Sequence, residues 1–426
     1  MDGTSNNPTI PTNIYRTYQE IEAHNDGKTI GIYLYGVGNI DHPTAGKAIA
    51  IGMEMRIARA YAYIIENYTA GDKIYIFGFS RGALSARALA GIISYAGIPQ
   101  IAESERKGEI TQKISHQIIE LVKDERDVDY RNAWGRWRQN DKPLLAELIK
   151  EQKILGRQGW ESQAAEIEFL GVWDTVPGSL ILMNEYFGNT DISCKERLDW
   201  NKKWPFKFFL VGGLAKGERY KIDTYPAIHF IAHAVSRDEK RSMFRPLFIC
   251  SKSINPETSF NDRFTTVNER VFPGAHADVG GGYEDFNNEL PEISLNWMLS
   301  LLREHYKFVG QPKTVLSGAN PIGLAHLSIS DSIASKGSKC RNRSEWPNDI
   351  KEDPSIATRE SAGELPLAIF SEKAASENPT RSCLHGFYSK ELEVEKIKCV
   401  TQNNINCGYI AEHNWIHTEL DKDDAR

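Results

Sequence analysis

The sequence predicts an α/β fold with a mostly parallel sheet and helices on both of its faces. Two observations carry this prediction. Short, continuous apolar runs at 29–36, 73–77 and 166–174 are typical of strands buried on both sides. Helical patterns at 44–68 and 83–96 follow the first two runs, so strand and helix alternate along the chain, as they do in parallel sheets.

The later elements follow with less regular spacing. A helix-like stretch, "AIHFIAHAVSRDEKR", covers 227–241, and a last core strand is expected at "ERVFPGAH", which ends at residue 276. Apolar residues at helical spacing predict an amphipathic helix over 292–306.

Two segments interrupt the alternation and predict the domain organisation. We expect a catalytic domain over 1–300 with insertions at about 101–165 and 183–225 that form a cap over the sheet. The first insertion is charged and largely helical, and one apolar face is marked by Ile114, Ile118, Ile119 and Val122. Residues 301–426 are expected to form a partly irregular extension that packs on the catalytic domain or on its cap.

Composition narrows the classes of function. The chain is 41% apolar and 25% charged, which is ordinary for a soluble globular protein, and its net charge of −6 argues against nucleic acid as a main partner. The six cysteines include no CxxC pair, so the sequence suggests neither a zinc site nor a redox dithiol, and we expect no metal or cofactor. The beginning lacks the pattern of a standard secretory signal and no apolar run is long enough to span a membrane, which predicts synthesis in the cytoplasm.

Ser80 is the strongest candidate for a catalytic residue. It lies in "GFSRG", a G-x-S-x-G motif between a predicted strand and a predicted helix, which is the context of a nucleophile elbow. The flanking glycines suit a crowded turn, and the following helix N-terminus favours developing negative charge. The alternative is a plain glycine turn with a capping serine.

A nucleophilic serine needs a base, and the base needs an orienting acid. Asp174 directly follows an apolar strand in "EIEFLGVWDTVPG", and His276 follows the last strand in "ERVFPGAHADVGGGY". Both therefore fit the chain order of serine, acid and histidine. The alternatives are a turn-capping aspartate and a hydrogen-bonded core histidine.

Four other polar residues compete for these roles. We interpret Asp238 as the partner of a neighbouring arginine and Asp278 as a brace for the glycine loop that follows His276. His229 and His233 are four residues apart on the helix expected there, but no glutamate stands between them as in H-E-x-x-H, so packing is the preferred interpretation.

An oxyanion hole requires two N–H donors. The residue after the nucleophile, Arg81, should supply one through its backbone. "MDGTSNN" is the candidate for the second, through the backbone of Gly3 or Thr4. An ordinary polar turn is the alternative.

Several stretches together resemble the bacterial and fungal α/β-hydrolase family catalogued as domain of unknown function 2235. This family includes the first class of lipase effectors of the type VI secretion system. The resemblance covers residues 1 to about 300 and lies in the motifs "DGTSNN", "TNIYRTY", "GVGN", "GDKIYIFGFSRGALSARALAG", "FLGVWDTVPGSL", "HAVSRDEKRSMFRP", "FPGAHADVGGGY" and "ISLNWML". Members usually carry an apolar strand before DGT, whereas here Met1 and Asp2 stand first.

The resemblance implies an α/β-hydrolase fold and a serine esterase, in characterised members a phospholipase acting on membrane glycerophospholipids. Carried onto this chain, it supports Ser80 as nucleophile, Asp174 as acid and His276 as base. It also implies an antibacterial effector that type VI machinery delivers into the periplasm of a target cell, with a secretion-spike partner and an immunity protein.

The second insertion bears on the substrate. Trp204, Phe206, Phe208 and Phe209 lie close to several lysines, a composition that suits contact with acyl chains at a membrane surface. A packed cap with a basic edge is the alternative. Two further functions remain open: a soluble carboxylesterase without a membrane role, and a non-catalytic interaction module on a hydrolase fold.

Overall fold

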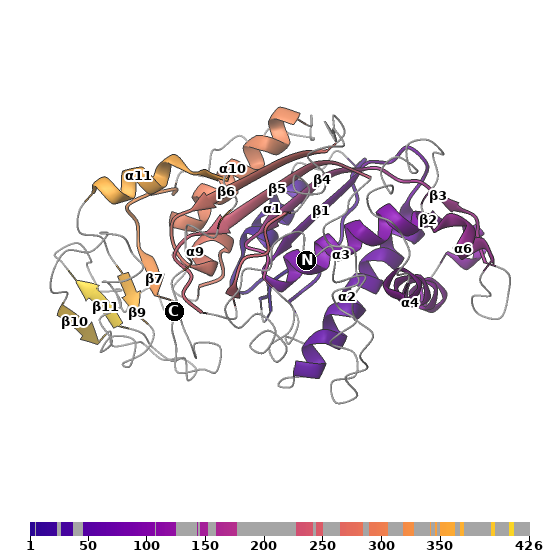
Figure 1. Ribbon diagram of the computed structural model, residues 1–426, viewed down its shortest axis with the longest axis horizontal. Coiled ribbons are helices and arrows are strands. Elements are labelled where there is room, and N and C mark those ends of the chain that lie inside the picture. The colour runs from indigo at the N-terminus through magenta and orange to yellow at the C-terminus, as the bar shows by residue number, and fades with distance from the viewer. Residues whose placement is uncertain are drawn as a thin grey trace. The chain divides into compact units, whose positions relative to one another are not determined.

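The structure is a computed structural model of the 426-residue chain (Figure 1). It describes residues 1–4, 6–23, 27–36, 46–106, 108–124, 143, 145–151, 159–176, 227–241, 244–249, 265–283, 289–305, 318–327, 341, 346, 350–362, 367–369, 393–396 and 409–412.

Two compact units make up the chain, and each is described by itself. The first consists of Met1–His233, Leu247–Glu269 and Lys307–Gly310. The second consists of Ala234–Pro246, Arg270–Tyr306 and Gln311–Arg426. The domain boundary expected near residue 300 stays a prediction.

A mostly parallel sheet with flanking helices organises the fold, which confirms the α/β class. In the described part of the chain its strands have the order β1-β4-β5-β6-β8 (Figure 1). Their bounds are β1 Ile74–Phe79, β4 Ile167–Trp173, β5 Ile228–Ser236, β6 Thr266–Phe272 and β8 Lys351–Glu352. Strands β1 and β4 pair in parallel, as do β6 and β8.

The helices of the first unit contact its strands or one another. They are α1 (Asn13–Ala23), α2 (Gly46–Asn67), α3 (Arg81–Ala96), α4 (Glu109–Asp124) and α6 (Ala146–Glu151). Helix α3 contacts both strands, and α2 lies against α3 and α4. A 3-10 turn, η1 (Glu103–Glu105), and the short strands β2 (Ile98–Pro99) and β3 (Ser162–Gln163) complete the described elements of this unit.

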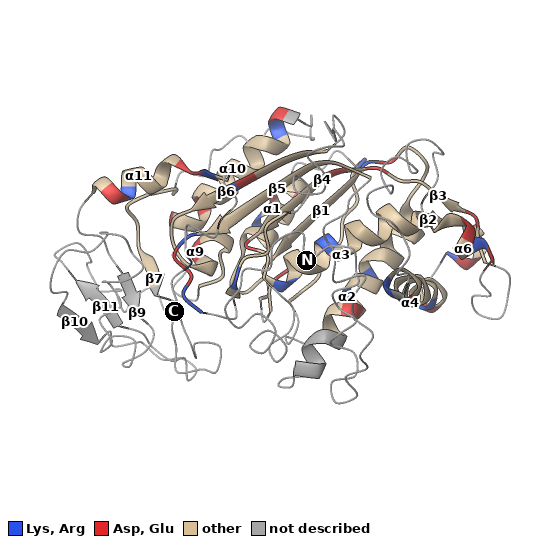
Figure 2. Cartoon of the chain, viewed as in Figure 1, with Lys and Arg blue, Asp and Glu red and all other residues tan. Residues whose placement is uncertain are grey.

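The first insertion, at about 101–165, is largely helical where it is described, as expected, although it also contains the short strand β3. Its predicted apolar face on α4 is fully buried at Ile114, Ile118, Ile119 and Val122. Charged residues of both signs are interspersed along α4 and α6 (Figure 2). The amphipathic pattern therefore marks the buried side of this helix, while its role as a cap stays a prediction.

The second unit contains α9 (His276–Gly280), α10 (Glu289–His305) and α11 (Pro354–Ser361). It also holds a four-stranded sheet in the order β10-β11-β9-β7. The bounds of these strands are β7 Ala325–Leu327, β9 Leu367–Ile369, β10 Glu393–Lys396 and β11 Tyr409–Glu412.

Two expected elements are wrong. The stretch expected as a helix over 227–241 contains strand β5, because a short apolar run buried on both sides has the same composition in a strand as in a core helix. Residues 29–36 form no regular strand, and Ile30 is 62% exposed. Their backbone instead makes hydrogen bonds with the N-terminal segment, from Asp2 N–H to Leu34 O and from Gly36 N–H to Asn6 O, both 3.0 Å long.

Candidate active site

Ser80 stands at the turn from β1 into α3 with a backbone that side chains rarely adopt. Its φ is 60° and its ψ −125°, and Ser80 and Asp174 are the non-glycine residues of positive φ in the described chain. A strained serine between a strand and a helix is the geometry that G-x-S-x-G predicts. The residue is 3% exposed.

The glycines of the motif are required by close approach of the backbone. A Cβ atom at Gly78 would lie 2.4 Å from the carbonyl oxygen of Gly82. A Cβ atom at Gly82 would lie 2.4 Å from the carbonyl oxygens of both Met1 and Asp2. Real Cβ atoms do not come this near to backbone, so the turn and the N-terminal segment are packed without space for side chains at these two positions.

The hydroxyl of Ser80 is not used as a helix cap. Within the described residues its side chain makes no capping hydrogen bond to α3, although its carbonyl accepts the N–H of Ala83 at 3.1 Å. The interpretation of a capping serine therefore loses its main support. The 16-residue helix that begins at Arg81 directs its first N–H groups and the positive end of its dipole toward this turn.

Asp174 lies beside the serine turn in the first unit. It follows β4, is fully buried and has a φ of 36°. The N–H of Ser80 donates to the carbonyl of Trp173 at 3.0 Å, so the chain next to Asp174 is tied to the chain at the serine. The N–H of Thr175 donates to Nε2 of the buried His233 at 3.1 Å, which holds the turn on its other side.

The N-terminal segment contacts the same turn. An added Cβ atom at Gly3 would lie 3.1 Å from Cβ of Ser80. The N–H of Gly3 donates to Oδ1 of Asp2 at 2.7 Å, and the other carboxylate oxygen accepts hydrogen bonds from the hydroxyls of Thr12 and Tyr33. The DGT segment is therefore anchored through Asp2 and lies against the serine.

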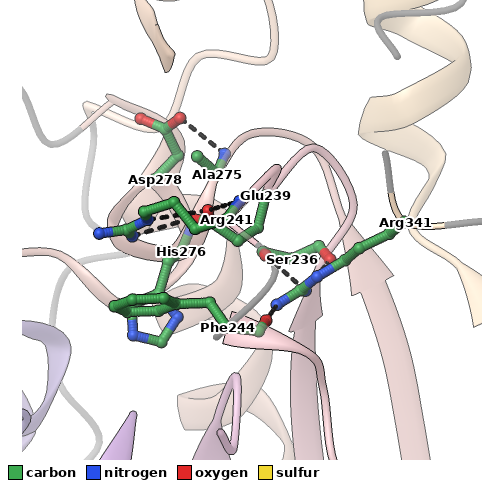
Figure 3. Close-up of polar contacts among 8 residues, drawn as sticks. All are labelled: Ser236, Glu239, Arg241, Phe244, Ala275, His276, Asp278 and Arg341. Atoms are coloured by element: carbon green, nitrogen blue, oxygen red, sulfur yellow. Dashed lines mark hydrogen bonds and ion pairs between the residues drawn. The ribbon is translucent and has the colours of Figure 1, made fainter. Parts of the chain in front are cut away.

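His276 begins α9 in the second unit, directly after a tight turn. The turn contains Gly274 at a φ of 96°, where a Cβ atom would lie 2.3 Å from Cβ of Asp278. The N–H of His276 donates to Oε2 of Glu239 at 3.2 Å (Figure 3). The imidazole ring meets the ring of Phe244 edge-on, with centroids 4.9 Å apart and planes at 76°.

Glu239 joins this turn to a nearby arginine. Its fully buried carboxylate accepts two hydrogen bonds from the guanidinium of Arg241, both 2.9 Å long. Burial acts to raise the pKa of Glu239, but Arg241, His276 and Arg341 together outweigh it and lower the pKa to about 2. The group is therefore a carboxylate at any working pH of the protein.

The competing aspartates have structural partners. Asp238 accepts Nε of Arg237 at 3.0 Å and the N–H of Gly274 at 2.7 Å, in line with the expected arginine pair. Asp278 accepts the N–H of Ala275 at 2.8 Å and pairs with Nδ1 of His326 at 2.6 Å. Both carboxylates hold the turn that carries His276.

Sequence reasoning missed Glu239, Arg241 and Phe244. All three lie in "SRDEKRSMF", a stretch in which only Asp238 was weighed. The usable signal was a cluster of charged residues of both signs directly after an apolar run. Polar residues at the end of a strand lie at the carboxyl edge of the sheet, where active sites gather.

His229 and His233 lie on β5 rather than on a helix. Nε2 of His229 lies 2.8 Å from Oε2 of Glu166, and Nδ1 of His233 lies 2.8 Å from Oε1 of Glu269. With Glu168, the first pair forms a group whose ligand atoms lie within 4.8 Å of one another. Lys73 pairs with Glu168 at 3.3 Å, so this group is an ion-pair cluster at the start of the strands.

The aromatic residues expected to contact acyl chains lie outside the described residues. They are Trp204, Phe206, Phe208 and Phe209, in the second insertion. Across the part of the chain that is described, we find no helix with the length and apolarity to cross a bilayer.

Several known proteins are similar to this chain. A yeast protein of Saccharomyces cerevisiae, the uncharacterized protein YEL023C, is 24% identical over 272 residues, which are 58% of this chain and 31% of the relative. An uncharacterized protein from Pseudomonas aeruginosa matches with 18% identity and a TM-score of 0.25, over 71% of this chain and 34% of its own.

The Tle1 effector bound to the VgrG spike of the type 6 secretion system matches with 18% identity and a TM-score of 0.27, over 64% of this chain and 40% of that protein. The chain thus spans about a third of the length of the relatives described above.

A family model matches residues 1–301, and its description reads "T6SS, Phospholipase effector Tle1-like, catalytic domain". This match confirms the resemblance to type VI lipase effectors, while membership in the wider family numbered 2235 stays a prediction. The match covers more than half of the sequence, and the chain belongs to the family of Tle1-like phospholipase effector catalytic domains of the type VI secretion system.

Proposed function

We propose that the protein is a serine hydrolase with an α/β-hydrolase fold that cleaves carboxylic esters of membrane phospholipids. The observation that carries this proposal is Ser80, held at positive φ between β1 and α3 by glycines that leave no space for a side chain. Strain of this kind is kept where the surrounding structure fixes it, and it is common at nucleophiles. Membership in the phospholipase effector family supports the same reaction.

In this mechanism His276 takes the proton of the Ser80 hydroxyl while the serine oxygen attacks the ester carbonyl carbon. The tetrahedral intermediate collapses, the alcohol leaves with the proton from His276, and the acyl group stays on Ser80. Water, deprotonated by His276, then releases the fatty acid. The two residues come from the two units, so the proposal requires that Oγ of Ser80 and a ring nitrogen of His276 come within about 3 Å of each other.

Asp174 is the proposed acid that orients His276. It is fully buried, lies next to the serine turn and has the backbone strain expected at a functional position. Asp238 is the weaker candidate, since one of its oxygens accepts Arg237 and the other accepts the backbone of Gly274.

The oxyanion is assigned to the N–H groups of Arg81 and Thr4. Arg81 is the first residue of α3, so its N–H directly follows the nucleophile at the positive end of the helix dipole. Gly3 was an equal candidate from the sequence, but its N–H donates to Asp2. Gly3 then serves by close approach, because its missing side chain lets the segment lie against Ser80.

Family membership also supports a route and a setting for the reaction. We propose delivery by the type VI machinery, with a secretion spike as partner, membrane phospholipid as substrate and the target-cell periplasm as the place of action. An immunity protein in the producing cell is part of the same proposal.

A serine-directed probe tests the catalytic part. A fluorophosphonate should label the wild-type chain at Ser80, and Ser80→Ala should abolish both labelling and ester hydrolysis without changing the melting temperature. Hydrolysis that persists in Ser80→Ala would show that another residue is the nucleophile.

Presentation of the substrate tests the lipid part. Phospholipid vesicles and a short-chain soluble ester are compared at equal ester concentration. A higher rate on vesicles supports a phospholipase, whereas turnover of the soluble ester alone would establish a carboxylesterase without a membrane role.

A further inference from the structure

We propose that Phe244 is a positioning residue that sets the orientation of the His276 imidazole, and that Arg241 and Arg341 hold Phe244 in place. This inference rests on the proposed function, in which His276 is the general base. All of the contacts that carry it lie in the second unit (Figure 3).

The imidazole of His276 and the ring of Phe244 form an edge-to-face pair. Their centroids are 4.9 Å apart and their planes meet at 76°. Aromatic pairs prefer this arrangement because the positive edge of one ring faces the negative face of the other. The contact therefore selects an orientation of the histidine ring as well as filling space beside it.

Arg241 packs on the face of the Phe244 ring. Its guanidinium lies over the phenyl ring, 3.6 Å from the centroid, which is a cation–π contact. The same guanidinium makes its two hydrogen bonds to Glu239, which also accepts the backbone N–H groups of Arg241 and His276. Glu239, Arg241 and Phe244 thus form a chain of contacts that links the backbone N–H of His276 to its imidazole ring.

Arg341 fixes the backbone of Phe244. It donates to the carbonyl of Phe244 and to the hydroxyl of Ser236, the latter at 2.6 Å. Ser236 is the last residue of β5, so this arginine ties the loop to the end of a core strand. Arg341 lies beyond residue 301, where the family match ends, which means that a residue outside the matched region supports the catalytic turn.

The orientation of a general base matters because proton transfer requires a defined distance and direction. A displacement of about 1 Å at a reacting group can lower a rate by up to about a hundredfold. Loss of an aromatic pair removes a smaller constraint, and we expect kcat to fall roughly 3- to 10-fold. Substrate contacts are unchanged, so KM should stay within about twofold.

Phe244→Leu is the principal variant, made in the full 426-residue chain. Steady-state hydrolysis of p-nitrophenyl butyrate gives kcat and KM, and the rate of inactivation by a fluorophosphonate reports the same base without turnover. Both rates should fall together, and Phe244→Tyr should restore them because it keeps the ring.

Phe230→Leu is the matched control. Phe230 is a buried aromatic near the start of β5 that stacks on Phe169 with centroids 5.4 Å apart. Its replacement removes an aromatic pair from the core of the first unit. It should lower the melting temperature and leave kcat unchanged.

Arg241→Lys and Arg341→Lys keep the proposal testable where Phe244→Leu fails to fold. Each retains the charge but loses the fork that makes two hydrogen bonds at once. Both should lower kcat in the same proportion as fluorophosphonate inactivation, with KM unchanged.

The outcomes separate this inference from the proposed function. An active wild type, an inactive His276→Ala and normal kcat in the Phe244 and arginine variants would overturn the positioning role alone. A wild type without hydrolysis, or full activity in His276→Ala, would overturn the proposed function and this inference with it. A fall of kcat in Phe244→Leu that Phe244→Tyr does not restore would also contradict the role of the ring.

Discussion

The turn that carries Ser80 and the turn that carries His276 are built in different ways. The serine turn is held by backbone packed on backbone, with Gly78 and Gly82 in positions where no Cβ atom fits. The histidine turn is held by buried charged side chains, among which Glu239 accepts the backbone N–H of His276 and Asp278 accepts that of the preceding Ala275. One turn depends on steric exclusion and the other on electrostatics.

This difference determines how each turn responds to pH, to salt and to substitutions that add volume. Steric packing is insensitive to pH and salt but tolerates no added volume. A buried carboxylate tolerates modest changes of volume but loses its contribution when it is protonated or left without a partner. The two turns can therefore be perturbed separately.

The largest effect is expected from Gly82→Ala in the serine turn. Alanine in a helix normally gains about 1 kcal/mol over glycine. Here its Cβ atom would lie 2.4 Å from two backbone oxygens of the N-terminal segment, so the steric cost dominates. We expect a net loss of about 3 kcal/mol in the free energy of unfolding, measured with urea, together with loss of ester hydrolysis.

Gly31→Ala is the control, because the nearest atom to its added Cβ lies at 3.7 Å, an ordinary contact. It should change the free energy of unfolding by less than about 0.5 kcal/mol. Wild-type stability and activity in Gly82→Ala would show that the N-terminal segment does not lie against α3.

The same difference explains what the sequence could predict. The glycines required by close packing stand two residues before and two residues after the serine, so a local motif indicated the elbow. Strand β1 and helix α3 were predicted on either side of it, and β4 was predicted further along the chain. The α/β class followed from the same continuous apolar strands. Strand β5 was missed because its buried run, unlike the runs before it, ends in residues that also suit a helix, "SRDEKR".

The supports of His276 could not be predicted in the same way. Glu239 and His276 are 37 residues apart, and Arg341 is 105 residues from Ser236. A side chain that acts across such a separation leaves no local pattern, because its partner is set by the fold. Asp238 and Asp278 were interpreted as structural only because they stand close to an arginine and a glycine loop.

The next effect is the pH-dependent contribution of Glu239 to the free energy of unfolding. Its pKa falls from 4.5 to about 2 on folding, so its contribution to stability is complete above about pH 4.5 and is lost as the pH falls toward 2. The shift corresponds to roughly 3 kcal/mol. Glu239→Gln should lower the free energy of unfolding by about that amount at pH 7.

The measurement is urea unfolding of both proteins between pH 7 and pH 2. The difference between wild type and Glu239→Gln should be constant down to about pH 4.5 and should shrink below it. Glu269→Gln is a control carboxylate that contacts His233 in the first unit. A difference that stays constant down to pH 2 would mean that the stabilising effect of Glu239 does not depend on its charge.

The smallest effect is expected at Asp278, two residues after His276 in α9. Its carboxylate accepts the N–H groups of Ala275 and His326 through Oδ2 and pairs with Nδ1 of His326 through Oδ1. Asparagine keeps a single acceptor oxygen, so Asp278→Asn leaves one set of donors without a partner, at a cost of about 1 to 3 kcal/mol.

A double-mutant cycle with His326→Gln isolates the side-chain pair from the backbone contacts. If the pair itself stabilises the turn, the two substitutions should be non-additive by about 1 kcal/mol in urea unfolding. Additive losses would assign the role of Asp278 to the backbone N–H groups alone. The histidine turn would then resemble the serine turn more closely, held through its backbone, with Glu239 and Asp238 as its links to the charged side chains of Arg241 and Arg237.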